Sequence, residues 1–254
     1  MSFQRKESGI MTESEAAARL QEIIDSSDNI VFFGGAGVST ESGIPDFRSQ
    51  DGLYSQSYKY PPETILSHSF FMQKPEEFYR FYHDKMLIKN AKPNKAHLKL
   101  AELENAGKIK AVITQNIDGL HQKAGSRNVY ELHGSTLRNH CMDCGRSYDT
   151  GYIMDADGVP VCESCGGIIK PDVVLYEESL DDATVEGAVK AISAADVLII
   201  GGTSLVVYPA AGFVNYYHGN RLVLINKGET SMDSEADLVI NAPIGEILGA
   251  VKVR

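Results

Sequence analysis

A glycine-rich stretch, Gly34 to Arg48, offers the first residues in this 254-residue chain that are suited to chemistry. It follows the apolar run Ile30–Phe33, which is typical of a buried strand. Glycines after such a strand let the backbone approach a diphosphate, and the N–H groups of a following helix N-terminus bind its charge. The last four residues, Pro45 to Arg48, add a rigid turn, an acid, an aromatic ring and a cation, which suits a ligand-lining loop.

Two Cys-x-x-Cys pairs form a second pattern, and they contain all four cysteines: Cys141, Cys144, Cys162 and Cys165. The pairs are separated by the residues from 145 to 161, a spacing that is typical of a four-thiolate zinc site. Four thiolates leave no position for water, so the metal is expected to be one structural zinc ion. His140 is a competing ligand, but the four thiolates already complete the shell.

Polar residues also follow three later apolar runs that are expected to be strands. The run Lys110–Thr114 leads into Gln115, Asn116, Ile117 and Asp118, and Val129–Leu132 leads into His133 and Gly134. The run Asp196–Ile200 ends in Gly201, Gly202, Thr203 and Ser204. The carboxyl ends of parallel strands bind ligands, although each segment taken alone also suits a local turn or a structural histidine.

In their order along the chain, these segments resemble the motifs of the sirtuins, a family of NAD-dependent protein deacylases, and the resemblance is to the bacterial type. It extends over about residues 12 to 250 and includes the segment Gly201–Ala211. The resemblance implies that His133 is the catalytic base, and that the peptide substrate pairs with Val173, Val174, Leu175 and Tyr176. The segment departs from the common Phe-Gly-Glu pattern, because this chain has Tyr176-Glu177-Glu178.

The same resemblance implies which residues bind NAD, the co-substrate. They are Ala36, Gly37, Thr40, Asp46, Phe47, Arg48, Gln115, Asn116, Ile117, Asp118, His133, Gly202, Thr203, Ser204, Asn226 and Ile244.

Strands that alternate with helices indicate the fold class: an α/β protein with an open, mostly parallel Rossmann-like sheet and helices on both faces. Residues 12-49, 107-136 and 171-254 are expected to form this NAD-binding domain. Two insertions interrupt it, a lid loop with a helical module at 50-106 and a structural zinc-ribbon module at 137-170. Thr12 to Glu15 is a capping box, and Pro75 and Asn94 begin helices within the first insertion.

The net charge of the chain indicates which classes of partner it is suited to bind. The formal net charge is -10, which disfavours nucleic acid and suits a basic lysine-bearing peptide, although acidic surfaces are common among soluble proteins. The first 15 residues are polar, and no apolar run approaches the ~18 residues of a membrane span. We therefore expect a cytoplasmic protein with acetyl-lysine proteins or peptides as partners and with no membrane or direct nucleic-acid partner.

The predicted function is NAD-dependent removal of acetyl groups from protein lysines. Sirtuins that favour succinyl groups carry Tyr-x-x-Arg, whereas this chain has Tyr79-Arg80-Phe81-Tyr82, so acetyl and longer apolar acyl groups are expected to be preferred. ADP-ribosyl transfer to protein and a non-catalytic zinc-stabilised binding module are the alternatives. A dehydrogenase is disfavoured, because Thr40 occupies the third glycine position of the dinucleotide fingerprint.

Overall fold

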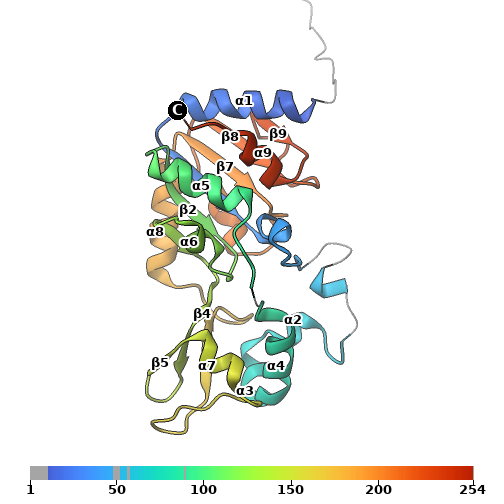
Figure 1. Ribbon diagram of the computed structural model, residues 1–254, viewed down its shortest axis with the longest axis vertical. Helices are drawn as coiled ribbons and strands as arrows, with labels where there is room; N and C mark the ends of the chain where they lie inside the picture. The colour runs from blue at the N-terminus through green and yellow to red at the C-terminus, as the bar shows by residue number, and fades with distance from the viewer. Residues whose placement is uncertain (1–10, 48–51, 56–57, 89, 254) are drawn as a thin grey trace, which may run out of the picture.

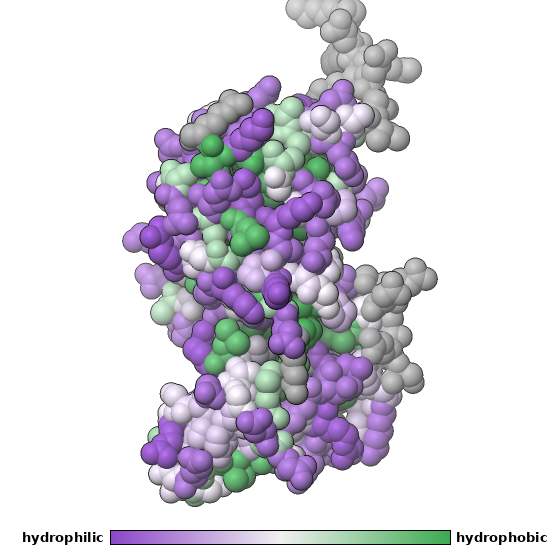
Figure 2. All heavy atoms as spheres, in the orientation of Figure 1, coloured by the Kyte–Doolittle hydropathy of each residue, from purple (hydrophilic) through white to green (hydrophobic). Residues whose placement is uncertain are grey.

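The computed structural model describes residues 11–47, 52–55, 58–88 and 90–253, which form a large and a small lobe (Figure 1). The large lobe contains a six-stranded sheet and the small lobe a three-stranded sheet. Hydrophobic atoms are visible at the waist between the lobes, on a face that is otherwise mostly hydrophilic (Figure 2). Within the described ranges, no helix has both the length and the apolar character needed to cross a membrane.

The large sheet is parallel throughout and has the strand order β3-β2-β1-β7-β8-β9. Its strands are β1 (Ile30–Gly34), β2 (Ile109–Thr114), β3 (Val129–Glu131), β7 (Val197–Gly201), β8 (Arg221–Ile225) and β9 (Leu238–Ile240). Gly34 at the end of β1 is aligned with Thr114 of β2 and with Gly201 of β7. The carboxyl ends of three central strands therefore lie side by side, which confirms the predicted fold class.

Helices cover both faces of this sheet, which explains why β1 is apolar throughout. Ile30 and Phe32 face a core shared with three helices: α1 (Glu13–Asp25), α5 (Lys95–Asn105) and α9 (Ile244–Ala250). Val31 and Phe33 face the opposite core, which is shared with α8 (Asp182–Ala194) and the 3-10 segment η5 (Ala210–Tyr216). The short helix α6 (Leu120–Ala124) packs beside α5.

Two predicted helix caps are confirmed. At the start of α1, the Glu15 N–H donates to Thr12 Oγ1 at 3.3 Å and the Thr12 N–H donates to Glu15 Oε2 at 2.9 Å. At the start of α5, Asn94 Oδ1 accepts the N–H groups of Ala96 and His97. The side chains thus satisfy N–H groups that have no partner within the helix.

The small lobe combines the two insertions. Its antiparallel sheet has the order β5-β4-β6, with β4 (Gly134–Cys141), β5 (Ser147–Tyr148) and β6 (Ile169–Val173). The first insertion contributes α2 (Pro62–Ile65), α3 (His68–Gln73), α4 (Pro75–Phe81) and the π-helical η4 (Tyr82–Met86), and the second contributes α7 (Thr150–Asp155). Phe71, Phe78 and Ile169 belong to one buried core, so each insertion buries apolar surface of the other.

The structure differs from the predicted organisation in three respects. The residues of the predicted insertion 50-106 divide between the lobes, because Leu100 and Leu103 of α5 belong to the core of the large lobe. The segment from Lys170 does not yet return to the large sheet, because β6 pairs with β4. Helices α2 and α3 were not predicted, since helices of four and six residues are too short to show a helical period.

Candidate active site

One cleft of about 1080 Å³ collects the residues that the sequence predicts for NAD and peptide. Arg48 lies outside the described residues. All the other predicted positions line the cleft: Ala36, Gly37, Thr40, Asp46, Phe47, Gln115, Asn116, Ile117, Asp118, His133, Val173, Val174, Leu175, Tyr176, Gly202, Thr203, Ser204, Asn226 and Ile244.

The two glycine-rich segments of the cleft are packed against each other. The Gly37 N–H donates to the carbonyl of Gly202 at 2.8 Å, and a Cβ on Gly37 would lie 2.8 Å from Gly202 Cα. Gly202 has a φ of +59°, which favours glycine. Instead of the predicted helix N-terminus, two 3-10 turns follow: η1 (Ala36–Val38) and η2 (Thr40–Ser42). Backbone N–H groups in such turns are still able to face an anion.

A polar cluster connects the glycine-rich loop to the end of β2. Ser39 Oγ donates to Asp118 Oδ2 at 2.7 Å and accepts from Asn116 Nδ2 at 3.1 Å. Asp118 Oδ1 also accepts the Leu120 N–H, so the residue makes the local turn contact as well as the long-range one. Ser39 is a lining residue that sequence reasoning missed, although its hydroxyl lay within the glycine-rich stretch that was singled out.

His133 is held in a defined tautomer at the end of β3. Its Nδ1 lies 2.9 Å from the carbonyl oxygen of Gln115, and because a carbonyl only accepts, Nδ1 carries the proton. Nε2 is then the unprotonated nitrogen. Burial lowers the pKa of His133 below its ordinary value of 6.5, although the Gln115 carbonyl acts in the opposite direction. The arrangement suits a neutral imidazole that accepts a proton.

Gly134 follows His133 and packs tightly against another strand. Its φ is +71°, and an added Cβ would lie 1.9 Å from the carbonyl oxygen of Asp172. The neighbour that requires a glycine is therefore strand β6, which pairs Gly134 with Val173. The close contact fixes the segment after His133 against the segment that leads to Tyr176.

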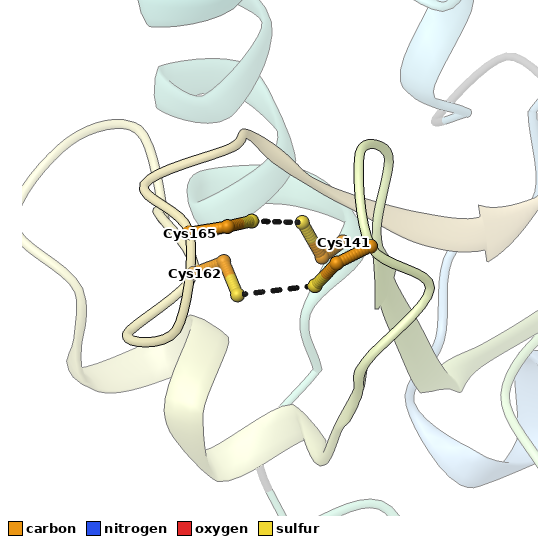
Figure 3. A group of neighbouring side chains, drawn as sticks. Cys141, Cys162 and Cys165 are labelled. Atoms are coloured by element: carbon orange, nitrogen blue, oxygen red, sulfur yellow. Dashed lines mark hydrogen bonds between the residues drawn. The ribbon is translucent and has the colours of Figure 1, made fainter.

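The four cysteine Sγ atoms lie within 4.8 Å of one another. Cys141 and Cys165 are 3.4 Å apart at sulfur, and Cys144 and Cys162 are 3.6 Å apart. A tetrahedral zinc with Zn–S bonds of about 2.3 Å requires sulfurs about 3.8 Å apart. Figure 3 shows the labelled side chains converging on one point. The cluster fits one structural zinc ion, and His140 is not part of it.

The acyl-preference prediction concerns two tyrosines that are fully buried. Tyr79 and Tyr82 belong to the core of the small lobe, and the Tyr79 hydroxyl donates to the carbonyl of Ile169. Neither residue is among those that line the cleft. Tyr82, which occupies the position of the Arg in the Tyr-x-x-Arg pattern, is thus a neutral side chain within the small-lobe core.

The sequence model of the Sir2 family matches residues 35–209. This chain belongs to the Sir2 family. The sirtuin is 64% identical over 236 residues to an NAD-dependent protein deacetylase of Clostridium perfringens (strain 13 / Type A), covering 92% of this chain and 97% of the relative. It is 61% identical over 235 residues to a protein of the same name from Clostridium acetobutylicum, with 91% and 96% covered.

Solved Sir2 structures resemble this sirtuin over nearly its whole length. A structure from work on the mechanism and regulation of Sir2 enzymes has a TM-score of 0.84 and 40% identity, covering 93% of this chain and 96% of that one. A Sir2 protein with a deacetylated p53 peptide and 3'-O-acetyl ADP-ribose has a TM-score of 0.83 and 40% identity, with 92% and 96% covered. A complex of Sir2 with p53 peptide and NAD+ has a TM-score of 0.80 and 40% identity, with 91% and 94% covered.

Proposed function

We propose that this sirtuin is an NAD-dependent protein-lysine deacetylase. The observation that carries the proposal is the state of His133 in the cleft, with Nδ1–H donating to Gln115 and with a lowered pKa. A ring in this state offers Nε2 as a general base at neutral pH. Relatives at up to 64% identity that bear the name NAD-dependent protein deacetylase support the proposal.

The reaction uses NAD as a second substrate. The acyl oxygen of acetyl-lysine attacks the anomeric carbon of the nicotinamide ribose, and nicotinamide leaves. This step leaves the acyl carbon as an amidate, bonded to the lysine nitrogen and to the ribose through the acyl oxygen. His133 Nε2 then removes the proton of a ribose hydroxyl, whose oxygen attacks that amidate carbon. Water completes the release of free lysine and O-acetyl-ADP-ribose. A general base of this kind contributes roughly 100- to 10,000-fold in rate.

The lining residues suggest how NAD is placed. The backbone of the glycine-rich loops is suited to the diphosphate, since glycines allow close approach. Asn116 and Asp118, connected through Ser39, are suited to orient the amide of nicotinamide. Asn226 is proposed to contact the adenosine ribose and Ile244 the adenine ring. Phe47 and Arg48 are proposed to guard the site of cleavage.

The acyl group is proposed to be acetyl or a longer apolar chain rather than succinyl. Tyr82 stands where the Tyr-x-x-Arg pattern has Arg, and a tyrosine side chain carries no positive charge that could pair with a second carboxylate. A buried carboxylate without such a partner is costly. Faster removal of succinyl than of acetyl from the same peptide would contradict this preference.

The substrates are proposed to be acetyl-lysine segments of cytoplasmic proteins. Sir2 proteins that share the fold bind p53 peptides, and the segment Val173–Tyr176 lines the cleft here. The Tyr176 N–H and C=O already pair with Leu66 and His68, so Tyr176 is expected to meet a peptide through its side chain. The net charge of -10 favours basic partners over membranes and nucleic acid.

An acetyl-lysine peptide, incubated with and without NAD, tests the proposal. Native zinc-loaded protein is expected to remove the acetyl mass only with NAD, and His133→Ala is expected to lower the rate roughly 100- to 10,000-fold. Product masses identify O-acetyl-ADP-ribose. Absence of turnover by the native protein on acetyl, butyryl and succinyl peptides would reject the proposal. Adenosine label that ends on protein would instead indicate ADP-ribosyl transfer.

A further inference from the structure

The segment from Tyr176 to Glu178 contacts both the loop beside Phe47 and the helices of the small lobe. The Tyr176 hydroxyl lies 2.8 Å from the hydroxyl of Tyr54, a hydrogen bond that crosses the cleft. Tyrosine replaces the phenylalanine of the common family pattern at position 176, so this hydroxyl is a feature of this chain.

On one side of the bond, Tyr54 is fixed to Phe47. The Tyr54 N–H donates to the Phe47 carbonyl at 2.8 Å, and the two rings pack edge to face with centroids 5.6 Å apart. The neighbouring pair is also bonded, because the Leu53 N–H donates to the Asp46 carbonyl at 2.9 Å. A displacement of the Tyr54 hydroxyl therefore displaces Phe47.

On the other side, Tyr176 is anchored by its own backbone and by its neighbour. Its N–H donates to the Leu66 carbonyl at 2.9 Å, and its carbonyl accepts the His68 N–H at 3.0 Å. The carboxylate of Glu177 accepts the N–H of Ser69 at 2.9 Å and its hydroxyl at 3.0 Å. Four hydrogen bonds to Leu66, His68 and Ser69, where α2 leads into α3, thus hold the Tyr176 ring at the cleft.

We infer that the Tyr54–Tyr176 hydroxyl pair positions Phe47 against the acyl-lysine segment, so that each substrate strengthens binding of the other. The inference rests on the proposed function for the identity of the two substrates. A peptide bound along Tyr176 fixes the Tyr176 ring. Through the hydrogen bond between the two hydroxyls, Tyr54 and the attached Phe47 are then fixed as well. Coupling of this kind is reciprocal, so NAD favours the peptide by the same factor.

Binding of a fluorescent acetyl-lysine peptide tests the inference, with and without a saturating non-cleavable NAD analogue in which carbon replaces the ribose ring oxygen. The ratio of the two peptide Kd values measures the coupling. Tyr54→Phe and Tyr176→Phe each remove one oxygen, and each is expected to lower this ratio about two- to twelve-fold. Because one bond is lost in either case, the double variant is expected to match the single variants.

Tyr60→Phe is the matched control in the same loop region. Its hydroxyl accepts from Lys74 Nζ at 2.9 Å, and Tyr60 does not line the cleft, so the coupling ratio is expected to stay at the native value. If the two hydroxyls had a purely structural role, Tyr54→Phe and Tyr176→Phe would lower the unfolding temperature or weaken the binding of each ligand separately. The ratio of the two peptide Kd values would then stay unchanged.

Three outcomes would overturn the inference: a native ratio of one, native coupling in both single variants, or a double variant that loses the sum of the two effects. Deacetylation is measured on the same preparations. Native turnover together with unchanged coupling rejects this inference alone. Absent native turnover rejects the proposed function, while the binding ratio still decides whether the hydroxyl pair couples the two sites.

Discussion

Individual residues in this sirtuin owe their roles to the atoms that surround them. His133 is buried and donates from Nδ1 to Gln115, which leaves Nε2 as the acceptor. Glu177 occupies a left-handed conformation with a φ of +77°, where the common family pattern has glycine. Two hydrogen bonds from Ser69 to its carboxylate compensate for the strain of this backbone conformation. Both residues therefore give predictions that concern single side chains.

The pH dependence of deacetylation reports the protonation of His133. Its pKa is lowered below 6.5, and the neutral ring is the active form. kcat/KM is therefore expected to rise with pH along a limb whose apparent pKa lies below 6.5, and to be level above neutrality. Initial rates between pH 4.5 and 8 measure the limb, with His133→Ala as the control that should lack it. A limb centred above 6.5 would contradict the assignment.

Substitutions of Glu177 separate backbone strain from hydrogen bonding. Glu177→Ala loses both bonds to Ser69 and keeps the left-handed backbone, so it is expected to lower the free energy of unfolding by about 1–3 kcal/mol. Glu177→Gly loses the same bonds but removes the strain, and should be about 1 kcal/mol more stable than the alanine variant. Urea denaturation measures both, and the exposed Glu186→Ala serves as control. A glycine variant less stable than the alanine variant would argue against strain.

At the scale of elements, the zinc site and the helices of the first insertion stabilise each other. Cys141 and Cys162 belong to the same buried core as Phe71 and Phe78. None of the four cysteines lines the cleft, so their influence on the reaction is indirect. The loops that hold the cysteines have no extensive core of their own, and metal binding supplies part of the folding free energy.

Loss of the metal is expected to disorder the small lobe and to weaken peptide binding. Cys144→Ser should reduce the zinc content below one ion per chain and lower the unfolding temperature. It should also lower the affinity for the acetyl-lysine peptide, because the substrate segment packs on this lobe. His140→Asn is the matched control and should retain one zinc ion. Atomic absorption and peptide titration measure both variants. Full peptide affinity in zinc-free protein would refute the structural role.

At the scale of the whole molecule, two histidines are buried where α5 meets α6. The rings of His97 and His121 lie 4.7 Å apart, and neither nitrogen of His121 has a hydrogen-bond partner among the described residues. Burial lowers the pKa of His97 to about 4 and that of His121 to about 3, with the neighbouring ring contributing to the second shift. The folded protein therefore keeps both rings neutral while the unfolded chain protonates them near pH 6.5.

The free energy of unfolding is consequently expected to fall as pH decreases from 6.5 toward 4. Above pH 6.5 neither the folded nor the unfolded state binds these protons, so the two histidines do not lower the free energy of unfolding there. Below it, each histidine lowers stability by up to about 1.4 kcal/mol per pH unit. Urea denaturation at several pH values measures the slope, and His121→Leu should reduce it by about one histidine's share. An equal slope in native and variant protein would contradict the assignment.

The sequence alone determined the chemistry of this protein. Strand periodicity and the Cys-x-x-Cys spacing predicted the parallel sheet and the zinc site, because these signals are local. The resemblance to the sirtuins supplied the residues that line the cleft, since each polar segment taken alone also suits a local turn. The division of residues 50-106 between two lobes was decided by tertiary packing, since Leu100 buries in one core and Phe78 in the other. The reason for Gly134 and the hydrogen bond from Tyr176 to Tyr54 likewise depend on segments that meet only after folding.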